Sequence, residues 1–146
     1  MTIHASAILV GARALLIRGA AGSGKSTLAF ALIRAGGSAT LPFTRLVGDD
    51  RLHVEAAHGR LLVRPAKTLR GLIEIRGLGI RQVPFEPMAV VGLVVDLGAA
   101  DTERVPASDS AVTELAGIRL PRVGVAAGTD ARPLVFAALR TTESPR

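Results

Sequence analysis

The eight residues Gly19 to Ser26 constrain the fold of this chain more than any other feature of the sequence. They match the complete phosphate-binding loop pattern, G-x4-G-K-S. An apolar run from Ala14 to Ile17 precedes the loop, and a segment from Ser26 to Ala35 without helix breakers follows it. Glycines allow a tight loop whose backbone N–H groups face a phosphate, and the positive end of the helix dipole favours the same anion. The sequence therefore predicts a strand, a phosphate-binding loop and a helix in this order.

The loop provides the first candidate site residues. Lys25 is expected to reach the β- and γ-phosphates of a nucleotide, and the Ser26 hydroxyl is expected to ligate Mg²⁺. The strand–loop–helix context argues against the alternative, a glycine-rich turn before an ordinary helix. The candidate nucleotide-binding residues are Gly19, Ala20, Ala21, Gly22, Ser23, Gly24, Lys25, Ser26 and Thr27.

Length and composition indicate one globular domain over residues 1–146. With 49% hydrophobic and 21% charged residues, the chain is neither disordered nor a coiled coil. The absence of cysteine excludes disulfides, thiolate metal sites and a cysteine nucleophile. No apolar run approaches the ~20 residues of a membrane-spanning helix, and no basic secretory leader begins the chain. We therefore expect a cytoplasmic domain without membrane segments.

The net charge of +6 is unevenly distributed along the chain. Residues 13–81 hold twelve Lys or Arg against four Asp or Glu, whereas residues 82–146 hold six against eight. A basic surface can bind nucleic acid. Trp and Tyr are absent, however, and there are only four Phe, so side chains for stacking bases are scarce. Because the basic half also contains the more specific phosphate loop, nucleic acid is not the expected partner.

The secondary-structure pattern predicts an α/β fold with a mixed sheet and flanking helices. A hairpin is expected around Gly11 and Ala12, and a second turn at His58 and Gly59. Ala111–Ala116 is expected to be a short helix, and three segments fit either a helix or a strand: Lys67–Ile75, Val123–Ala127 and Leu134–Leu139. The expected strands are Ile3–Val10, Ala14–Arg18, Thr44–Val47, Arg51–Ala56, Arg60–Val63 and Met88–Leu97. Without strict alternation of strand and helix, a purely parallel sheet is not expected.

Phosphoryl transfer also needs a carboxylate near the metal and the γ-phosphate, and two places offer one. Asp96 ends the apolar run from Val91, as in a Walker B strand, whereas Asp49 and Asp50 follow a shorter apolar run. Neighbouring aspartates on an extended segment point to opposite sides, so one could face the phosphates while the other supports the structure or the metal. The alternative for this pair is a solvated turn. The local pattern leaves the choice open.

A third motif, Glu74 to Ile80 (EIRGLGI), identifies the family that this chain resembles. Together with the phosphate loop, the Asp49-Asp50 pair and His4, which precedes Lys25 by 21 positions, it resembles the catalytic domain of HPr kinase/phosphorylase. The resemblance covers His4 to about Leu139. It implies a P-loop kinase domain of the HPr kinase C-terminal, phosphoenolpyruvate-carboxykinase-like type, in a short form without the family's N-terminal domain.

The resemblance implies a serine protein kinase that uses ATP and Mg²⁺. Its protein substrate and partner would be the phosphocarrier HPr or an HPr-like protein, and the reverse reaction would be phosphorolysis of the phosphoserine. The hexamers of the family imply a homo-oligomer. Two alternatives stay open: a non-catalytic ATP-binding sensor on the same fold, and a P-loop kinase of a small molecule. The latter would need an arginine-rich lid and a substrate domain, for which 146 residues leave little room.

The resemblance also implies residue roles. Asp50 matches the catalytic carboxylate, a base in the forward reaction and an acid in reverse. His4 matches a histidine near the phosphates, and Glu74 matches a position that binds Mg²⁺ together with Ser26. Arg76 matches a residue used in both reactions, where a guanidinium could stabilise the transferring phosphoryl group. The plain alternatives are a surface histidine and a Glu74–Arg76 ion pair. Asp96 is then left with a role in the structure or in support of the metal ligands, and His53 and His58 with surface or loop positions.

Three departures from the family pattern qualify this expectation. Thr27 stands where the family usually has glutamate, and Arg104 is the nearest match to a catalytic arginine in a loop. The segment Gly124–Asp130 keeps only Val125 and Gly128 of a family stretch that is important for dephosphorylation. The resemblance therefore implies kinase activity more firmly than phosphorylase activity.

Overall fold

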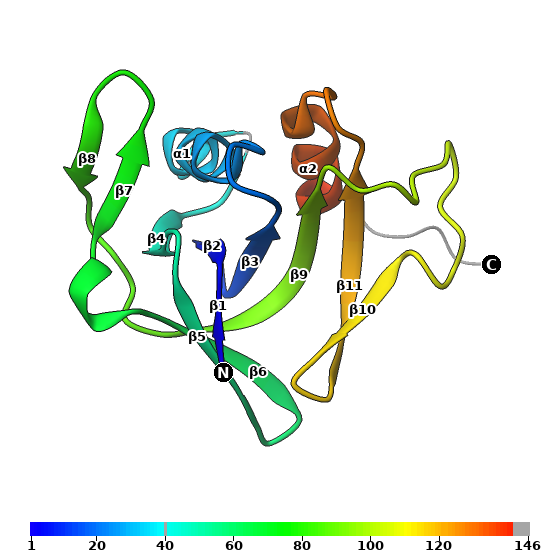
Figure 1. Cartoon of the computed structure of the whole chain (residues 1–146), viewed down its shortest axis with the longest axis horizontal. Coiled ribbons are helices and arrows are strands. Elements are labelled where there is room, and N and C mark those ends of the chain that lie inside the picture. Colours follow the sequence, from blue (N-terminus) through cyan, green and yellow to red (C-terminus); the bar gives the residue numbers. More distant parts are fainter. Residues whose placement is uncertain (40, 142–146) are drawn as a thin grey trace.

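The structure is a computed structural model that describes residues 1–39 and 41–141. These residues form a nine-stranded mixed sheet, a two-stranded ribbon, one 3₁₀ helix and two α-helices (Figure 1). The elements in chain order are β1 (Thr2–Ile3), β2 (Ala5–Val10), β3 (Arg13–Arg18), α1 (Lys25–Ala35), β4 (Thr44–Gly48), β5 (Leu52–Ala57), β6 (Arg60–Pro65), η1 (Lys67–Leu69), β7 (Leu72–Ile75), β8 (Gly79–Gln82), β9 (Ala89–Leu97), β10 (Val112–Leu115), β11 (Ile118–Val125) and α2 (Ala131–Arg140).

Strand β9 organises the large sheet. The strand order is β1-β5-β6-β9-β3-β2-β4, and β11 also pairs with β9 and carries β10 on its other edge. Strands β3 and β11 run parallel to β9, whereas the remaining pairs of the large sheet are antiparallel. The start of β9 pairs with β6, and its last four residues pair with β11. The predicted mixed sheet is confirmed, and the almost wholly apolar β9 is its central strand. The apolar composition predicts a fully buried strand, but five of the nine residues of β9 are only partly buried.

The local predictions agree with the structure where the sequence signal was strong. The β2–β3 and β5–β6 hairpins are present, and His58 and Gly59 both have positive φ angles at their turn. Lys67–Ile75, for which either a helix or a strand was expected, contains both, because the 3₁₀ helix η1 is followed by the strand β7. Leu134–Leu139 belongs to α2, and Val123–Ala127 overlaps the end of β11.

The predicted helix at Ala111–Ala116 is wrong. Residues Val112–Leu115 form β10, which pairs antiparallel with β11. The reason is the turn that follows, since Ala116 and Gly117 have φ angles of 51° and 79° and close a tight hairpin. Leu115 packs on the core from this hairpin. A contact between strands outweighs the weak helical preference of six residues.

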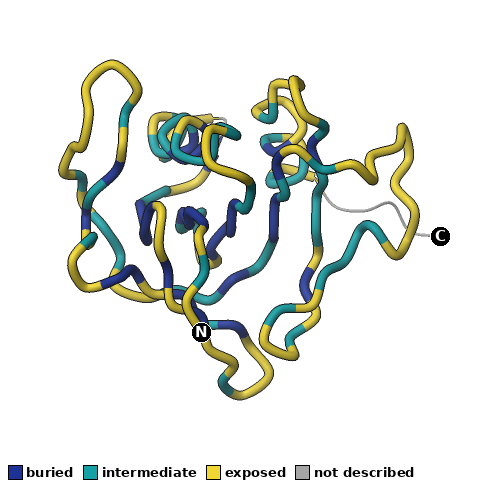
Figure 2. The backbone as a smooth tube through the Cα atoms, viewed as in Figure 1, coloured by how far each residue is buried: buried dark blue, intermediate teal, exposed yellow. Residues whose placement is uncertain are grey.

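The sheet has an apolar core on each face. Because side chains alternate along a strand, Leu15 and Ile17 of β3 pack with the helices, whereas Ala14 and Leu16 pack against the opposite cluster. Figure 2 shows buried backbone along the central strands and exposed backbone in the hairpin turns and loops. Each buried Leu, Ile or Val side chain contributes about 1.5–3 kcal/mol. This core fixes the carboxyl end of β3, from which the phosphate loop leaves.

Neither of the two described α-helices has the length and apolar character needed to cross a membrane.

Candidate functional site

The phosphate loop connects β3 to α1, as the sequence predicted. Gly22 and Gly24 have φ angles of 80° and 100°, which residues with a β-carbon rarely adopt. Gly24 is also the N-cap of α1, and it has no side chain to cap the first-turn amides. These N–H groups are therefore open to an anion. The Lys25 ammonium donates hydrogen bonds to the carbonyls of Gly19 and Ala20, at 2.8 and 3.1 Å.

The side chain of Ser23 also indicates that the loop binds a ligand. Its hydroxyl oxygen is buried and has no hydrogen-bond partner within the described part of the chain. A buried polar atom without a partner is costly, and a phosphate at the loop would offer one. The loop therefore fits the phosphates of a nucleotide.

Asp49 links the phosphate loop to the sheet and to β7. Its carboxylate is 5% exposed and accepts hydrogen bonds from the hydroxyls of Ser6 and Ser26. The Ser26 oxygen is 2.9 Å from each carboxylate oxygen. The backbone N–H of Glu74 donates to the same carboxylate at 3.2 Å. Three donors from three elements thus orient one buried carboxylate.

The side chain of Asp50 points in a different direction from that of Asp49, because the chain reverses at this residue. The N–H of Arg51 donates to the carbonyl of Asp49 at 2.9 Å, the bond pattern of a γ-turn, and φ of Asp50 is 71°. Such turns with positive φ are rare and strained, and strained residues concentrate at functional sites. The carbonyl of Asp50 accepts a bond from the N–H of Ala5 at 3.2 Å, which ties the turn to β2. Asp49 is consequently buried while Asp50 is exposed.

A cavity of about 670 Å³ is lined by residues of all three sequence motifs: the phosphate loop, the Asp49-Asp50 pair and the EIRGLGI segment. Its wall comes from the phosphate loop, the Asp49-Asp50 turn, the end of η1 and the β7–β8 ribbon. The predicted site residues that line it are Ala21, Gly22, Gly24, Lys25, Ser26, Thr27, Asp50, Glu74 and Arg76. The structure therefore brings together residues separated by about fifty positions in the sequence.

Two predicted catalytic residues lie elsewhere. His4 lines a second cavity, although its neighbour Ala5 is hydrogen-bonded to Asp50. Arg104 is exposed in the connection between β9 and β10. In Figure 1 this connection lies on the opposite side of the molecule from the β7–β8 ribbon. Neither residue lines the cavity at the phosphate loop.

Asp96 is engaged in an ion-pair network. It accepts two hydrogen bonds from Arg18, at 2.7 and 2.8 Å, and another from Arg122. Burial raises the pKa of Asp96, but the hydrogen bonds from the two guanidinium groups outweigh it and hold this pKa below its usual range. Arg122 in turn binds Asp101 at 2.9 and 3.0 Å. The network joins β3, β9 and β11, in agreement with the structural role expected for Asp96.

The altered segment Gly124–Asp130 leads into α2. The Asp130 carboxylate accepts a hydrogen bond from the backbone N–H of Arg132 at 3.1 Å and thereby caps this helix. Hydrogen bonds from the Arg132 side chain and backbone lower the pKa of Asp130 to about 2. No residue of this segment lines the cavity at the phosphate loop.

The sequence argument did not assign Ser6, and for the Asp49-Asp50 pair it did not say which aspartate supports the structure or the metal. The signal for Asp49 was its position directly after the apolar run that ends at Gly48, which is shorter than the run before Asp96. Ser6 had a weaker signal: it is the one hydroxyl in the otherwise apolar β2.

The cavity has the donor set for a magnesium ion that a nucleotide brings with it. The described residues contain no group of three or more His, Asp or Glu placed to hold a metal ion without further ligands. Magnesium is usually bound through one or two carboxylates together with substrate phosphates and water. The cavity offers Ser26, Asp49 and Glu74, so these residues fit a magnesium–nucleotide complex.

The chain is similar to known proteins. The family model of the HPr serine kinase C-terminal domain matches residues 1–142. HPr kinase/phosphorylase of Enterococcus faecalis is 35% identical over 135 residues, and that of Streptococcus sanguinis is 31% identical over 135 residues. The match covers 85% of this chain and 41% of each relative, so the chain spans less than half of their length.

A solved structure extends the likeness to three dimensions. The HPr(Ser) kinase/phosphatase from Coxiella burnetii superposes with a TM-score of 0.73 at 26% identity. The match covers 95% of this chain and 93% of the other.

Proposed function

This chain belongs to the HPr serine kinase C-terminal domain family, and we propose that it transfers the γ-phosphoryl group of ATP to a serine of HPr or an HPr-like phosphocarrier. The observation that carries the proposal is the contact of Ser26 and Glu74 with Asp49, which places the phosphate loop and the family motif on one cavity. The names of the relatives and of the matched structure support HPr as the substrate class.

In the proposed forward reaction, Asp50 takes the proton from the serine hydroxyl of the protein substrate. The seryl oxygen forms a bond to the γ-phosphorus, the bond from this phosphorus to the bridging oxygen breaks, and ADP leaves. Asp50 suits the role because it is exposed and lines the cavity, whereas Asp49 is buried and held by three donors. A base in contact with the substrate hydroxyl contributes typically 10²–10⁴-fold to turnover.

The other residues of the cavity are proposed to bind and orient the nucleotide and its magnesium ion. The loop amides and Lys25 hold the phosphates, and Arg76 stabilises the negative charge of the transferring group. Ser26 and Glu74 would hold Mg²⁺, with Asp49 behind Ser26, and the bound ion would neutralise phosphate charge. His4 and Arg104 lie outside this cavity and remain proposals from family resemblance.

The proposal includes the reverse reaction. Inorganic phosphate would attack the phosphorus of phosphoserine, the bond to the seryl oxygen would break, and pyrophosphate would leave while Asp50 returns a proton to the serine. The same proton-transfer geometry serves both directions. Since Gly124–Asp130 departs from the family pattern and Asp130 caps α2, we expect the kinase reaction to dominate.

The surface beside the cavity is suited to a protein substrate. Leu78 and Ile80 of the β7–β8 ribbon are 61% and 63% exposed, and Ile80 also lines the cavity. Contiguous exposed apolar side chains can mark an interaction site, and we propose that these two contact the protein substrate. We propose that the chain forms a homo-oligomer, which would be a hexamer by family resemblance. Light scattering of the purified chain tests this assembly. We also propose a cytoplasmic location, where ATP is available.

The experiment that tests the function mixes the purified chain with ATP, Mg²⁺ and HPr. Mass spectrometry should find one phosphate on a serine of HPr. Phosphorylation of an added small metabolite without modification of HPr would favour the small-molecule kinase. Nucleotide binding without any transfer would favour the sensor.

A further inference from the structure

The hydroxyl of Ser6 is buried inside the molecule, and none of the motifs that predicted the site contains it. Among the described residues, Ser6 and Asp49 are the two polar or charged residues that are buried. A hydroxyl group that leaves water loses its hydrogen bonds there, so a buried one needs a partner inside the protein. The partner of Ser6 is Asp49, whose Oδ1 atom accepts its hydrogen bond.

The backbone brings these two residues together at the end of two antiparallel strands. The N–H of Ala5 donates to the carbonyl of Asp50 at 3.2 Å. Ser6 follows Ala5 and Asp49 precedes Asp50, so the antiparallel direction of β2 and β4 places Ser6 next to Asp49. Asp49 lines the cavity at the phosphate loop, here called the nucleotide cavity, whereas Ser6 does not. Ser6 therefore acts on this cavity through Asp49.

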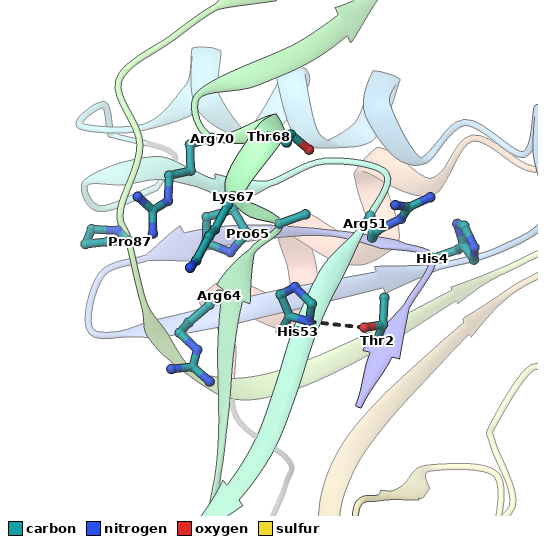
Figure 3. Close-up of a pocket in the computed structure, with 11 residues that line it drawn as sticks. Thr2, His4, Arg51, His53, Arg64, Pro65, Lys67, Thr68, Arg70 and Pro87 are labelled. Atoms are coloured by element: carbon teal, nitrogen blue, oxygen red, sulfur yellow. Dashed lines mark hydrogen bonds between the residues drawn. The ribbon is translucent and has the colours of Figure 1, made fainter.

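The residues on the other side of the Ala5–Asp50 bond belong to a different cavity. Figure 3 shows His4 and Arg51 among the basic side chains that line the second cavity, of about 840 Å³. The contact between Ser6 and Asp49 is thus separate from this second cavity.

The end of β4 is held firmly where it carries Asp49. The register of β2 against β4 shifts next to Ala7, which lies opposite Gly48, and such irregularities re-aim the side chains beside them. Gly48 is closely surrounded, because a β-carbon there would lie 2.5 Å from the side chain of Leu52 and 3.1 Å from that of Pro65. Asp49 follows this crowded position directly, so its backbone has little room to move.

Both carboxylate oxygens of Asp49 are engaged. Oδ1 accepts from the hydroxyl of Ser6, Oδ2 accepts from the N–H of Glu74, and the hydroxyl oxygen of Ser26 lies 2.9 Å from each of them. Donors on both oxygens prevent the carboxylate group from rotating. The Ser26 hydrogen is then directed at Asp49, which leaves the lone pairs of the Ser26 oxygen for a metal ion. Without Ser6 the carboxylate could rotate, and Ser26 could turn its hydrogen towards the metal.

We propose that Ser6 is a positioning residue for the magnesium–nucleotide complex. Through Asp49 it orients the Ser26 hydroxyl, so that the hydroxyl oxygen can bind Mg²⁺. The inference rests on the proposed function, in that the phosphate loop binds a nucleotide together with Mg²⁺. Removal of a group that orients a metal ligand typically lowers metal affinity or activity about 10–100-fold. Because Ser6 does not line the nucleotide cavity, its loss should spare nucleotide binding without metal.

Titration of ATP into the whole chain, with Mg²⁺ and with EDTA, tests the proposal in the absence of HPr. Ser6→Ala should reduce the gain in ATP affinity that Mg²⁺ provides by at least about tenfold, and should keep the affinity measured in EDTA. With HPr as the substrate, the Mg²⁺ concentration at half-maximal rate should rise, whereas kcat at saturating Mg²⁺ should stay close to that of the wild type. A loss of stability alone would change neither quantity in the folded protein. If Ser6→Ala keeps the full gain from Mg²⁺, or if the wild type has none, the proposal is wrong.

Ser6→Thr and Ser6→Val form a matched pair. Threonine and valine have nearly the same shape, and only threonine keeps a hydroxyl. Ser6→Thr should keep the gain from Mg²⁺ and Ser6→Val should lose it, whereas equal gains in the two variants would overturn the role of the hydroxyl. If the added methyl group prevents folding, Ser6→Ala, which only removes an oxygen atom, decides the question.

The same measurements separate this inference from the proposed function. A gain from Mg²⁺ that depends on Ser6, together with HPr that stays unmodified, would support the positioning role and reject the HPr kinase. Phosphorylated HPr, together with a gain that does not depend on Ser6, would reject the positioning role and keep the kinase.

Discussion

The hydroxyl oxygen of Ser26 lies 2.9 Å from both carboxylate oxygens of Asp49, which is 23 positions away in the sequence. This contact ties the first turn of α1 to the end of β4. It orients the hydroxyl that would bind magnesium and leaves the neighbouring Asp50 free to face the cavity. The different burial of these two adjacent aspartates follows from the turn at Asp50, where φ is 71°.

Ser6→Ala tests the support of this carboxylate. Ser6 is fully buried, and its hydroxyl donates to Asp49. Without this donor a buried carboxylate is less well satisfied, so the free energy of unfolding should fall by about 1–3 kcal/mol. Urea denaturation measures the change. Ser110→Ala, which removes an exposed hydroxyl bound to a backbone carbonyl, serves as the control and should have a smaller effect. Equal stability of Ser6→Ala and the wild type would show that Asp49 does not need this donor.

Lys25→Ala tests the phosphate loop. The ammonium of Lys25 contacts only loop carbonyls in the contacts described above, so the fold should survive its removal. Nucleotide-dependent phosphorylation should be lost, as followed by phosphate incorporation with thermal unfolding as the check on folding. Lys67→Ala removes the only other lysine, which lies outside the nucleotide cavity, and should keep nucleotide binding. Turnover of Lys25→Ala near the wild-type rate would reject the loop assignment.

Glu74→Gln and Ser26→Ala test the proposed magnesium ligands. ATP should bind to the wild type more tightly with Mg²⁺ than without it, and each variant should lose much of this difference. Titration of nucleotide affinity against Mg²⁺ concentration measures it. Glu114→Gln, an exposed change on β10, is the control. If both site variants keep the full magnesium effect, these residues do not hold the ion.

The Asp96 network should make stability depend on pH. The pKa of Asp96 lies below its usual range in the folded state because hydrogen bonds from Arg18 and Arg122 outweigh burial. A lowered pKa contributes stability that is present above the unfolded-state pKa, about 3.9, and is lost as the pH falls through the folded-state value. Asp96→Asn should lower the free energy of unfolding by about 1–3 kcal/mol at pH 7. Denaturation at several pH values should show this difference shrinking below about pH 4. A constant difference across this range would contradict the pKa assignment.

The sequence predicted those parts of the molecule that local signals determine. The phosphate loop requires glycines at fixed positions, and the hairpins follow from turn residues between alternating apolar runs. The helix expected at Ala111–Ala116 was wrong because the pairing of β10 with β11 depends on contacts outside that segment. The ribbon strand β8 was missed, since its four residues are exposed and show no apolar alternation.

The sequence likewise predicted some residues of the site and missed others. The phosphate-loop pattern indicated Lys25, the resemblance to a known family indicated Asp50 and Glu74, and all three line one cavity. The support that Ser6 gives to Asp49 depends on the register of β2 against β4, which no local pattern specifies. The second cavity collects basic side chains from positions 4 to 70, and they have no common spacing in the sequence. Only the folded sheet places them side by side.

The most direct test of the proposed function compares Asp50→Asn with Asp96→Asn. Asparagine keeps the size of the side chain but cannot accept a proton from serine. With HPr as the substrate, turnover of Asp50→Asn should fall about 10²–10⁴-fold at every Mg²⁺ concentration, while ATP affinity changes far less. Asp96→Asn should act through stability, with turnover close to that of the wild type once the protein is folded. A defect in Asp96→Asn that no Mg²⁺ concentration corrects, together with normal turnover of Asp50→Asn, would contradict the assignment of Asp50 as the base.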